Sequence, residues 1–444
     1  MFRRMLKMAE AFRAGFISAA VFCALALTTS ISNFLVAATN LPSPETLHIL
    51  SRALHLDPGP DKPVTMVMID EVDYAGLGEP VPMRKSHLAA LIDKLRPMKP
   101  KAILVDFDIS SPTASDDMAL LETVLSGWSD SDPLLMFPRE LTHQAKGSGE
   151  PSAMSTAFDQ HFLGTRPIFW ISSVFQNSEG GGLDEWNLWT TTQNSCEALL
   201  SPQLLLYLWP RQGSPVETRK AAACLASAET GGTCAVAPRC DSSANIDHEG
   251  LMNRRKAPVR FVLGDDLQKG PSQDFVTTDG KSKPAFYLWS SGDVLSRGIA
   301  AASVQDRIVI IGGAYAKAGD RHDTPIGRMD GARVLANAIS TGDRMLEARH
   351  VSDFTTNALT VLLATIALVG FLNLKPIFFG LAYFASMLAV YAGALHLADA
   401  NTAVTIVRGT IGLTAILIGV ESVFAFVKDL LCHRLGWRAF LNNS

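Results

Sequence analysis

The residues best suited to chemistry in this 444-residue chain are acids that directly follow predicted strands. Open parallel sheets bind ligands beyond the carboxyl ends of their strands, and these acids fall there. With neighbouring polar side chains they could edge a pocket for a cation, or for a basic or polar small molecule. The candidate ligand-binding residues are Asp70, Glu71, Arg84, His87, Asp106, Asp108, Asp320, His322, Thr324 and Asn337.

Several of these residues also have a purely structural explanation. An aspartate at a strand end commonly caps the next helix or fixes a turn, so Asp70 and Asp106 could do only that. His322 could sense pH, because the pKa of histidine lies near neutrality, or it could simply be exposed. Asn337 falls in an apolar helical pattern, and we expect it to hydrogen-bond a neighbouring loop backbone. Arg84 could pair with a strand-end carboxylate or face solvent.

A catalytic alternative rests on "AILVDFDIS" (Ala102–Ser110). This segment is similar to the strand ending in D-x-D of haloacid-dehalogenase phosphatases, and "VLGDD" (Val262–Asp266) is similar to their late metal-binding acids. Such carboxylates could bind magnesium and support covalent phosphoryl chemistry. However, another predicted strand precedes the motif, and no convincing phosphate-binding lysine lies between the two segments. We therefore expect a protein without catalytic activity, cofactor or metal.

The elements that carry these residues alternate between strand and helix. Continuous apolar runs predict buried strands, and apolar residues at helical spacing predict the helices between them. This pattern indicates an α/β domain with a mostly parallel sheet and helices on both faces. The strands are expected at 64–69, 102–107, 133–137 and 306–313, and the helices at 86–95, 115–125 and 331–342. A further helix in "EALLSPQLLLYLW" is expected to be interrupted at Pro202.

Four cysteines lie close together in what we interpret as an insertion at about 190–255. An even number of cysteines in an oxidising compartment favours two disulfides, for which three pairings are possible. A zinc site is disfavoured because the spacings lack a C-x-x-C pair. The disulfide candidates are Cys196, Cys224, Cys234 and Cys240.

Four apolar stretches bracket the polar block, at 14–38, 356–374, 377–398 and 402–427. Each is about the ~20 residues that a helix needs to cross a bilayer, so we expect one N-terminal and three C-terminal transmembrane helices. Lysine and arginine are concentrated in the flanks 1–13 and 428–444, which predicts that both flanks are cytoplasmic and that 39–351 lies on the extracytoplasmic side of the membrane. A cleaved signal peptide is the alternative for the first stretch.

Two charged residues, Arg408 and Glu421, fall inside the last apolar stretch. Charge in a membrane is costly and usually faces a partner or a cavity, so both are candidates for contact with another membrane protein. Arg408 could instead extend its head group to the outer surface. The formal net charge of the chain is -4, so no basic excess indicates nucleic-acid binding.

Two segments resemble one known family. "VTMVMIDEVDYAGLGEPVPMRKSHLAALIDKLRPMKPKAILVDFDIS" and "DRIVIIGGAYAKAGDRHDTPIGRMDGARVLANAIS" are similar to the opening and closing parts of CHASE sensory domains of the second type, the cyclase/histidine-kinase-associated sensory extracellular domains. The arrangement of one span before and three after the domain resembles the same family.

The resemblance implies a sensory input module in the periplasm, held in a bacterial inner membrane. Members of the family often carry a cytoplasmic output domain after the last span. The residues at 428–444 are too few for one, so we expect the output to come from a separate protein partner. A homodimer is possible, because sensory modules often signal as dimers. The alternative is a structural or assembly subunit of a cell-envelope complex.

Overall fold

The computed structural model divides the chain into two compact units, Gly59–Glu347 and the combination of Met1–Pro58 with Ala348–Ser444. The structure describes residues 60–142, 151–172, 175–177, 183–192, 197–229, 256–259, 261, 270–271, 274–276, 282–324, 327–347, 359–363, 365, 406, 410 and 414. Among these residues, no helix combines the length and the apolar character needed to cross a membrane. The four predicted spans fall almost entirely outside the described residues.

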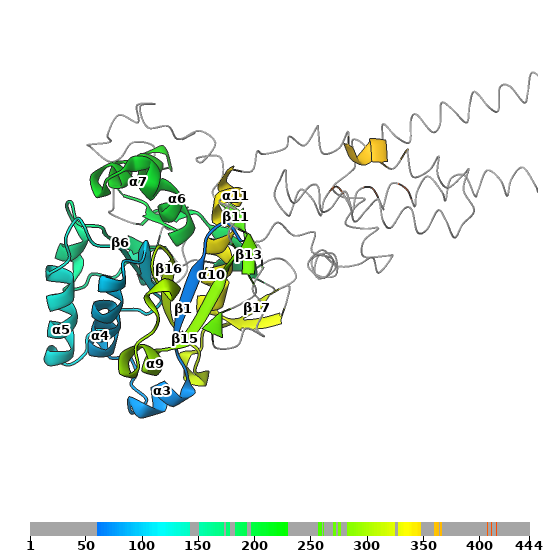
Figure 1. Cartoon of the computed structure of the whole chain (residues 1–444). Helices are drawn as coiled ribbons and strands as arrows, with labels where there is room; N and C mark the ends of the chain where they lie inside the picture. Colours follow the sequence, from blue (N-terminus) through cyan, green and yellow to red (C-terminus); the bar gives the residue numbers. More distant parts are fainter. Residues whose placement is uncertain are drawn as a thin grey trace, which may run out of the picture. The chain divides into compact units, whose positions relative to one another are not determined.

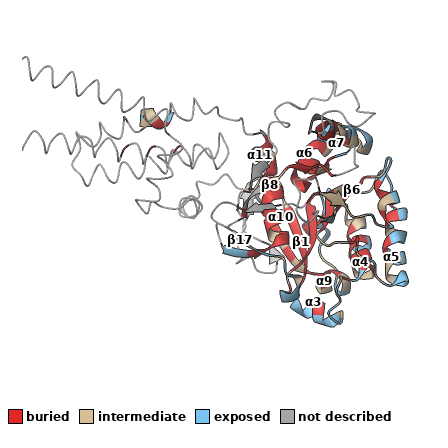
Figure 2. Cartoon of the chain, turned by 180° about the vertical axis from the view of Figure 1, so that it is seen from behind, coloured by how far each residue is buried: buried red, intermediate tan, exposed pale blue. Residues whose placement is uncertain are grey.

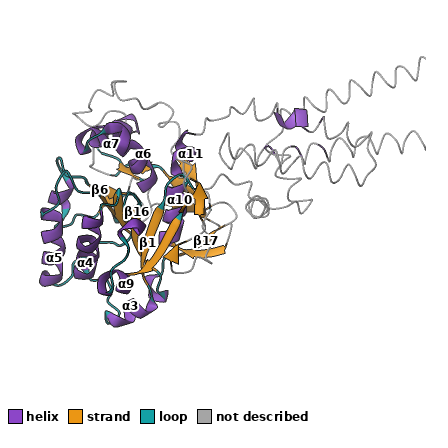
Figure 3. Ribbon diagram, viewed as in Figure 1, coloured by secondary structure: helices purple, strands orange, loops and turns teal. Residues whose placement is uncertain are grey.

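A mostly parallel sheet forms the centre of the unit Gly59–Glu347 (Figures 1 and 3). Its nine described strands run in the order β12-β15-β1-β16-β2-β3-β6-β10-β9, with antiparallel strands only at the two edges. The predicted α/β architecture with a mostly parallel sheet is confirmed. The strands are β12 (Gly270–Pro271), β15 (Phe286–Ser290), β1 (Val64–Ile69), β16 (Ile308–Gly313), β2 (Ala102–Val105), β3 (Leu134–Pro138), β6 (Ile168–Ile171), β10 (Leu199–Leu200) and β9 (Trp189–Thr190).

The central strands are apolar along their whole length because helices cover both faces of the sheet. Every residue of β1, β2 and β16 is buried. Val64 pairs with Phe286 on one side and with Ile308 on the other, so β1 lies between two strands that follow it by more than two hundred residues.

Each face of the sheet has its own apolar core, visible as the buried inner sides of the helices in Figure 2. The helices that pack on the first core are α3 (Glu71–Gly76), α4 (Lys85–Leu95), α5 (Ser115–Ser126) and α9 (Ser291–Ser296). Those on the second core are α6 (Pro202–Gln212), α7 (Pro215–Glu229), α10 (Gly331–Ser340) and α11 (Gly342–Glu347).

Short elements complete the described fold. Single-turn helices are η1 (Arg96–Met98), η2 (Asp159–Phe162), η3 (Ala301–Ser303) and η4 (Ala316–Ala318). The remaining strands form small antiparallel sheets: β4 (Leu141–Thr142) with β5 (Ser152–Ala153), β7 (Phe175–Asn177) with β8 (Leu183–Asn187) and β11 (Lys256–Pro258), β13 (Asp274–Val276) with β14 (Ser282–Pro284), and β17 (Arg321–Thr324) with β18 (Gly327–Asp330).

The helix that we expected to be interrupted at Pro202 instead begins there, as α6. The hydroxyl of Ser201 caps the helix by accepting a hydrogen bond from the N–H of Leu204, at 3.3 Å. Proline is tolerated in the first turn of a helix because the N–H that it lacks would have no partner there. The prediction of an interruption is therefore wrong.

Candidate functional site

The strand order creates a switch point at the centre of the sheet. From β1 the chain passes over one position to reach β2, and β16 later fills that position. The connection from β1 to β2 carries α4 on one face, whereas α10, which follows β16, packs on the other. The carboxyl ends of β1, β16 and β2 thus meet where helices leave in opposite directions, which is the usual ligand position in such sheets.

Asp106 lies at this switch point, one residue beyond β2. Its N–H donates to the carbonyl of Ile311 on β16, at 2.7 Å. Its Oδ2 atom is shielded from solvent and accepts no hydrogen bond from any described residue. Burial raises the pKa of Asp106 well above its usual range, and the negative charge of Asp320 raises it further. The site therefore favours a neutral, protonated carboxyl at Asp106.

Asp320 brings a second carboxyl to the same place, against the first residue of α10. The carbonyl of Asp320 accepts the N–H of Gly331 at 2.9 Å. A β-carbon built on Gly331 would lie only 2.0 Å from Oδ2 of Asp320, so the carboxylate occupies the space that glycine leaves open. His322 adds a polar ring, with Nε2 2.7 Å from Oδ1 of Asp320. We call Asp106 and Asp320 the acid pair.

Charged residues form ion pairs at the start of α10, next to Gly331. Asp330, the residue before α10, lies 3.4 Å from the guanidinium of Arg321 and 3.9 Å from that of Arg333. The positive end of the α10 dipole lies at the same place. A protonated carboxyl at Asp106 can donate a hydrogen bond, and the carboxyl oxygens of Asp320 can accept one, which suits a polar or basic small ligand.

The acids after β1 have structural roles. The Oδ1 atom of Asp70 accepts the N–H groups of Val72 and Asp73, each at 3.0 Å, and so caps α3. The carboxylate of Glu71 accepts the N–H of Ala316 at 2.9 Å, which links α3 to the loop after β16. The structure confirms the helix-capping role that we considered for Asp70.

The carboxylate of Asp108 bonds the turn that follows it. Its carboxylate accepts the N–H of Ser110 at 2.7 Å and the hydroxyl of Ser111 at 2.8 Å. Burial alone would raise the pKa of Asp108, but these hydrogen bonds outweigh it and lower the pKa. The two acids of the D-x-D segment therefore have opposite environments, and only Asp106 lies in the candidate site.

Arg84 and His87 also lie apart from the acid pair. Arg84 is exposed and lines a surface hollow of about 710 Å³ with Pro82 and Leu120; among the described residues it pairs with none of the strand-end carboxylates. His87 Nε2 lies 3.2 Å from the hydroxyl of Ser291. Burial lowers the pKa of His87, and Asp73 opposes this.

His87, Ser291 and Asp73 are linked in a different order from the residues of a hydrolase triad. Ser291 donates to Asp73 Oδ2 at 2.8 Å, so the serine stands between the acid and His87. A nucleophilic serine instead requires the histidine to stand between serine and acid. Ser291 is also fully buried, which keeps its hydroxyl from a substrate.

Two predicted residues stabilise local elements. Thr324 donates its hydroxyl to the carbonyl of Gly327 across the β17–β18 hairpin. Asn337 is fully buried in α10, where it donates to the carbonyl of Arg333 one turn earlier, at 2.9 Å, and contacts the sulfur of Met329 at 3.8 Å. Its amide thus donates within its own helix, and the predicted hydrogen bond to a neighbouring loop backbone stays a prediction.

The remaining predicted residues lie mostly beyond the described part of the chain. Cys224, on α7, is buried and disulfide-bonded. Its pairing stays a prediction, because the other disulfide candidates and the two membrane-contact candidates, Cys196, Cys234, Cys240, Arg408 and Glu421, lie outside the described residues, as does "VLGDD". Within the described residues, no cluster of three or more His, Cys, Asp or Glu side chains has a metal-binding arrangement.

Sequence reasoning missed Gly331, which makes room for Asp320, and Arg307, which precedes β16. The guanidinium of Arg307 is buried and bonds the hydroxyl of Thr65 and three backbone carbonyls. A glycine at the first position of an apolar helix was a usable signal for a close approach. An arginine directly before a continuous apolar strand was a usable signal that the Arg307 guanidinium is buried and bonds neighbouring strands.

Comparison with known proteins identifies a family whose region of similarity includes the candidate site. A family model described as the CHASE2 domain matches residues 21–372, which is most of the chain and includes the sheet and the acid pair. The family resemblance read from the sequence is thereby confirmed. No curated protein and no solved structure matches.

Proposed function

We propose a sensory function for this chain, which belongs to the CHASE2 family of extracellular sensory domains. In this proposal the domain at 39–351 lies in the periplasm of a bacterium and is held in the inner membrane by four transmembrane helices. It binds a ligand or a protein without catalysis. A separate partner in the membrane or cytoplasm reads the resulting change.

The observation that carries the proposal is the carboxyl of Asp106. A shielded oxygen without a hydrogen-bond partner among the described residues is costly, and it is explained if a ligand completes the site. The carboxyl oxygens of Asp320 beside it are hydrogen-bond acceptors and favour a ligand with hydrogen-bond donors or positive charge. A basic or polar small molecule is therefore the ligand class that this site supports best.

Helix α10 supplies a route from the acid pair to the end of the domain. It begins at Gly331, in contact with Asp320, and ends at Ser340. The carbonyl of Ser340 accepts the N–H of Lys62 at 3.1 Å, so this end of α10 meets the segment that enters β1. If α10 can adopt two positions, a ligand that binds the domain more tightly in one of them favours that position. The difference between the two affinities sets how far the equilibrium shifts, and the end of α10 at Ser340 would move with it.

The test is mild-detergent purification of the full-length protein from native membranes, followed by mass spectrometry of bound molecules. We expect the wild type to retain a partner or small molecule that Asp320→Asn loses, while Asp130→Asn, an exposed acid remote from the site, retains it. A stoichiometric partner that all three proteins retain equally would contradict sensing at the acid pair and favour the assembly-subunit role.

The position of the membrane needs its own experiment. Protease added to intact spheroplasts is expected to cleave within 39–351 and to spare tags at both chain ends. Cleavage of the end tags with survival of the domain would contradict the proposed topology.

A further inference from the structure

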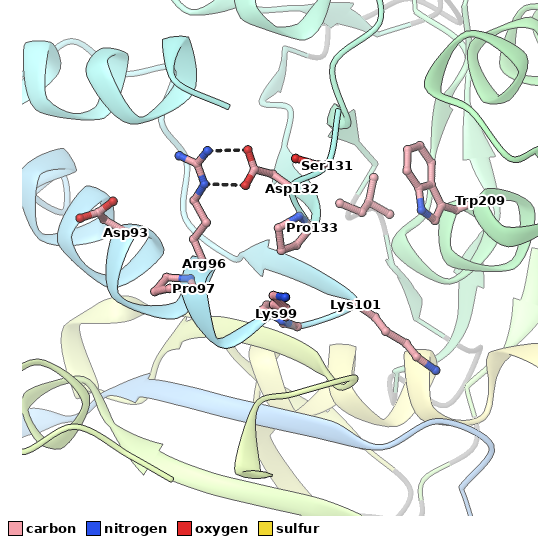
Figure 4. A pocket seen from close by; sticks show the side chains of 11 residues that line it. Asp93, Arg96, Pro97, Lys99, Lys101, Ser131, Asp132, Pro133 and Trp209 are labelled. Atoms are coloured by element: carbon pink, nitrogen blue, oxygen red, sulfur yellow. Dashed lines mark hydrogen bonds and ion pairs between the residues drawn. The ribbon is translucent and has the colours of Figure 1, made fainter. Parts of the chain in front are cut away.

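A second hollow, with a volume of about 870 Å³, lies at the opposite ends of the central strands from the acid pair. Figure 4 shows the side chains that line it. It opens at the amino ends of β2 and β3, where Lys101 directly precedes β2 and Pro133 directly precedes β3. Trp209 of α6 lines it as well. We propose that this hollow binds a small organic anion that carries a flat ring.

One wall of the hollow is a fixed, electrically neutral pair. The guanidinium of Arg96 donates two hydrogen bonds to the carboxylate of Asp132, at 2.6 and 2.5 Å, drawn as dashed lines in Figure 4. The same guanidinium lies over the ring of Trp128, 4.9 Å from its centroid. This bidentate geometry is rigid, and it leaves neither charge available for a ligand.

The remaining charges favour an anion. Lys99 and Lys101 line the hollow, are exposed, and form no ion pair with any residue that the structure describes. Only one further acid lines it, the exposed Asp93 at the end of α4. Two lysines against one acid leave a positive hollow, and lysine ammonium groups bind carboxylate and phosphate groups as point charges.

The backbone at Lys99 supports a role for its side chain. Lys99 has a φ of 55° and a ψ of 54°, the left-handed conformation that a lysine rarely adopts. Asp306 shares this conformation, with a φ of 58°, and donates its N–H to the carbonyl of Lys99 at 3.2 Å. Glycine or asparagine would adopt such a conformation at less cost, and observed strain of this kind is a reason to infer function.

The opposite wall supplies an aromatic surface. Trp209 is half-buried, and its indole meets the ring of Phe169 edge-on, with centroids 5.9 Å apart. In Figure 4, Trp209 lies on one side of the hollow and the Arg96–Asp132 pair on the other. An indole held in place can stack with a flat ring, and the volume falls in the range that small-molecule sites occupy.

The test is binding of benzoate and phenylphosphate to the purified full-length protein, measured by isothermal titration calorimetry. We expect saturable binding of at least one of them, weakened at least about tenfold in Lys99→Gln/Lys101→Gln. Lys94→Gln removes an exposed lysine of the same region outside the hollow and serves as the matched control. Benzyl alcohol lacks the charge and inorganic phosphate lacks the ring, so neither is expected to compete.

Trp209→Leu is expected to weaken ring-bearing anions while the protein remains folded by circular dichroism. Absence of saturable binding by both probes, equal affinity in the double-lysine variant, or equal competition by inorganic phosphate would overturn the proposal. Asp106→Asn and Asp320→Asn should leave this binding unchanged, so failure here is distinguishable from failure of the acid-pair proposal.

Discussion

The ammonium of Lys62 lies 2.6 Å from Oδ1 of Asp343, although the two residues are 281 positions apart. Lys62 stands just before β1 and Asp343 stands in α11, so the ion pair joins the segment that enters the sheet to the segment that ends the described domain. Burial lowers the pKa of Lys62, and the charge of Asp343 acts against this. The pair couples the two ends that a membrane-linked sensor would have to move.

A double-mutant cycle on Lys62→Met and Asp343→Asn measures this coupling. Both side chains are partly shielded, at 18% and 29% exposure, so we expect a coupling energy of about 1 kcal/mol, larger than that of a surface pair. Urea unfolding of the four proteins gives the value. The exposed pair Lys220–Glu217, 2.7 Å long, is the matched control and should couple by less than about 0.5 kcal/mol. Additive effects at Lys62 and Asp343 would contradict the prediction.

Asp106→Asn tests the environment of the acid pair. Because burial and Asp320 raise the pKa of Asp106, the folded protein holds a proton that the unfolded chain releases above its ordinary pKa of 3.8. This contribution to stability is fully present below that value and is lost as the pH rises through the folded pKa. Asparagine has the same shape as a protonated aspartate but does not titrate. The free energy of unfolding of Asp106→Asn should therefore not fall as the pH rises through that range, and the variant should be more stable than the wild type at neutral pH.

The readout for Asp106→Asn is the free energy of unfolding at a series of pH values. Asp108→Asn is the control, because the pKa of Asp108 is lowered and its stabilisation should be lost as the pH falls. If Asp106→Asn retained the decline of the wild type with rising pH, the assignment of a protonated carboxyl would be wrong.

Asp117 caps α4 from outside the helix. Its carboxylate accepts the N–H of Ser86 at 2.7 Å and that of Lys85 at 2.9 Å. Burial alone would raise the pKa of Asp117, but hydrogen bonds from Ser86 and Lys85 lower it to about 2. Its stabilisation is therefore present above the ordinary pKa of 3.8 and is lost as the pH falls toward 2.

Asp117→Ala should destabilise the protein by about 1 kcal/mol at neutral pH, as loss of a helix cap usually does. The difference from the wild type should shrink on acidification to pH 3, measured by thermal unfolding. Asp116→Ala alters the neighbouring exposed acid and should have little effect. Equal losses in both variants would show that the cap contributes nothing specific.

The strands could be predicted from the sequence, whereas their order could not. The continuous apolar runs of β1 and β16 indicate strands buried on both faces, and the structure has them at the expected positions. Nothing local indicates that β16 enters between β1 and β2, because the pairing of Val64 with Ile308 depends on packing across the whole domain.

The candidate site, like the sheet, could be predicted only in part from the sequence. The pattern placed Asp106 and Asp320 at strand ends, and the strand order brings them together. It could not separate Asp106 from Asp108, because the turn formed with Ser110 decides which acid faces the switch point. The hollow at Lys99 and Lys101 was not predicted, because it depends on the docking of α6 beside strands distant in sequence.

Arg307 should be especially sensitive to substitution. It is 4% exposed, and its Nε donates to the hydroxyl of Thr65 at 2.9 Å. Its other nitrogens donate to the carbonyls of Val64, Pro284 and Ala285 at 2.8 to 2.9 Å, so one side chain ties β16 to β1 and to the start of β15. Burial lowers the pKa of Arg307 to about 10, which leaves the guanidinium charged at neutral pH.

Arg307→Met should cost about 3 kcal/mol or more, because it removes four hydrogen bonds made by one buried guanidinium. Arg307→Lys keeps one or two of the bonds and should cost less, although the ammonium cannot reproduce the planar fork. Urea unfolding of full-length protein measures both. Arg297→Met replaces an arginine whose side chain is 83% exposed and should change stability by less than about 0.5 kcal/mol. A methionine variant as stable as this control would show that the hydrogen bonds of Arg307 contribute nothing measurable to stability.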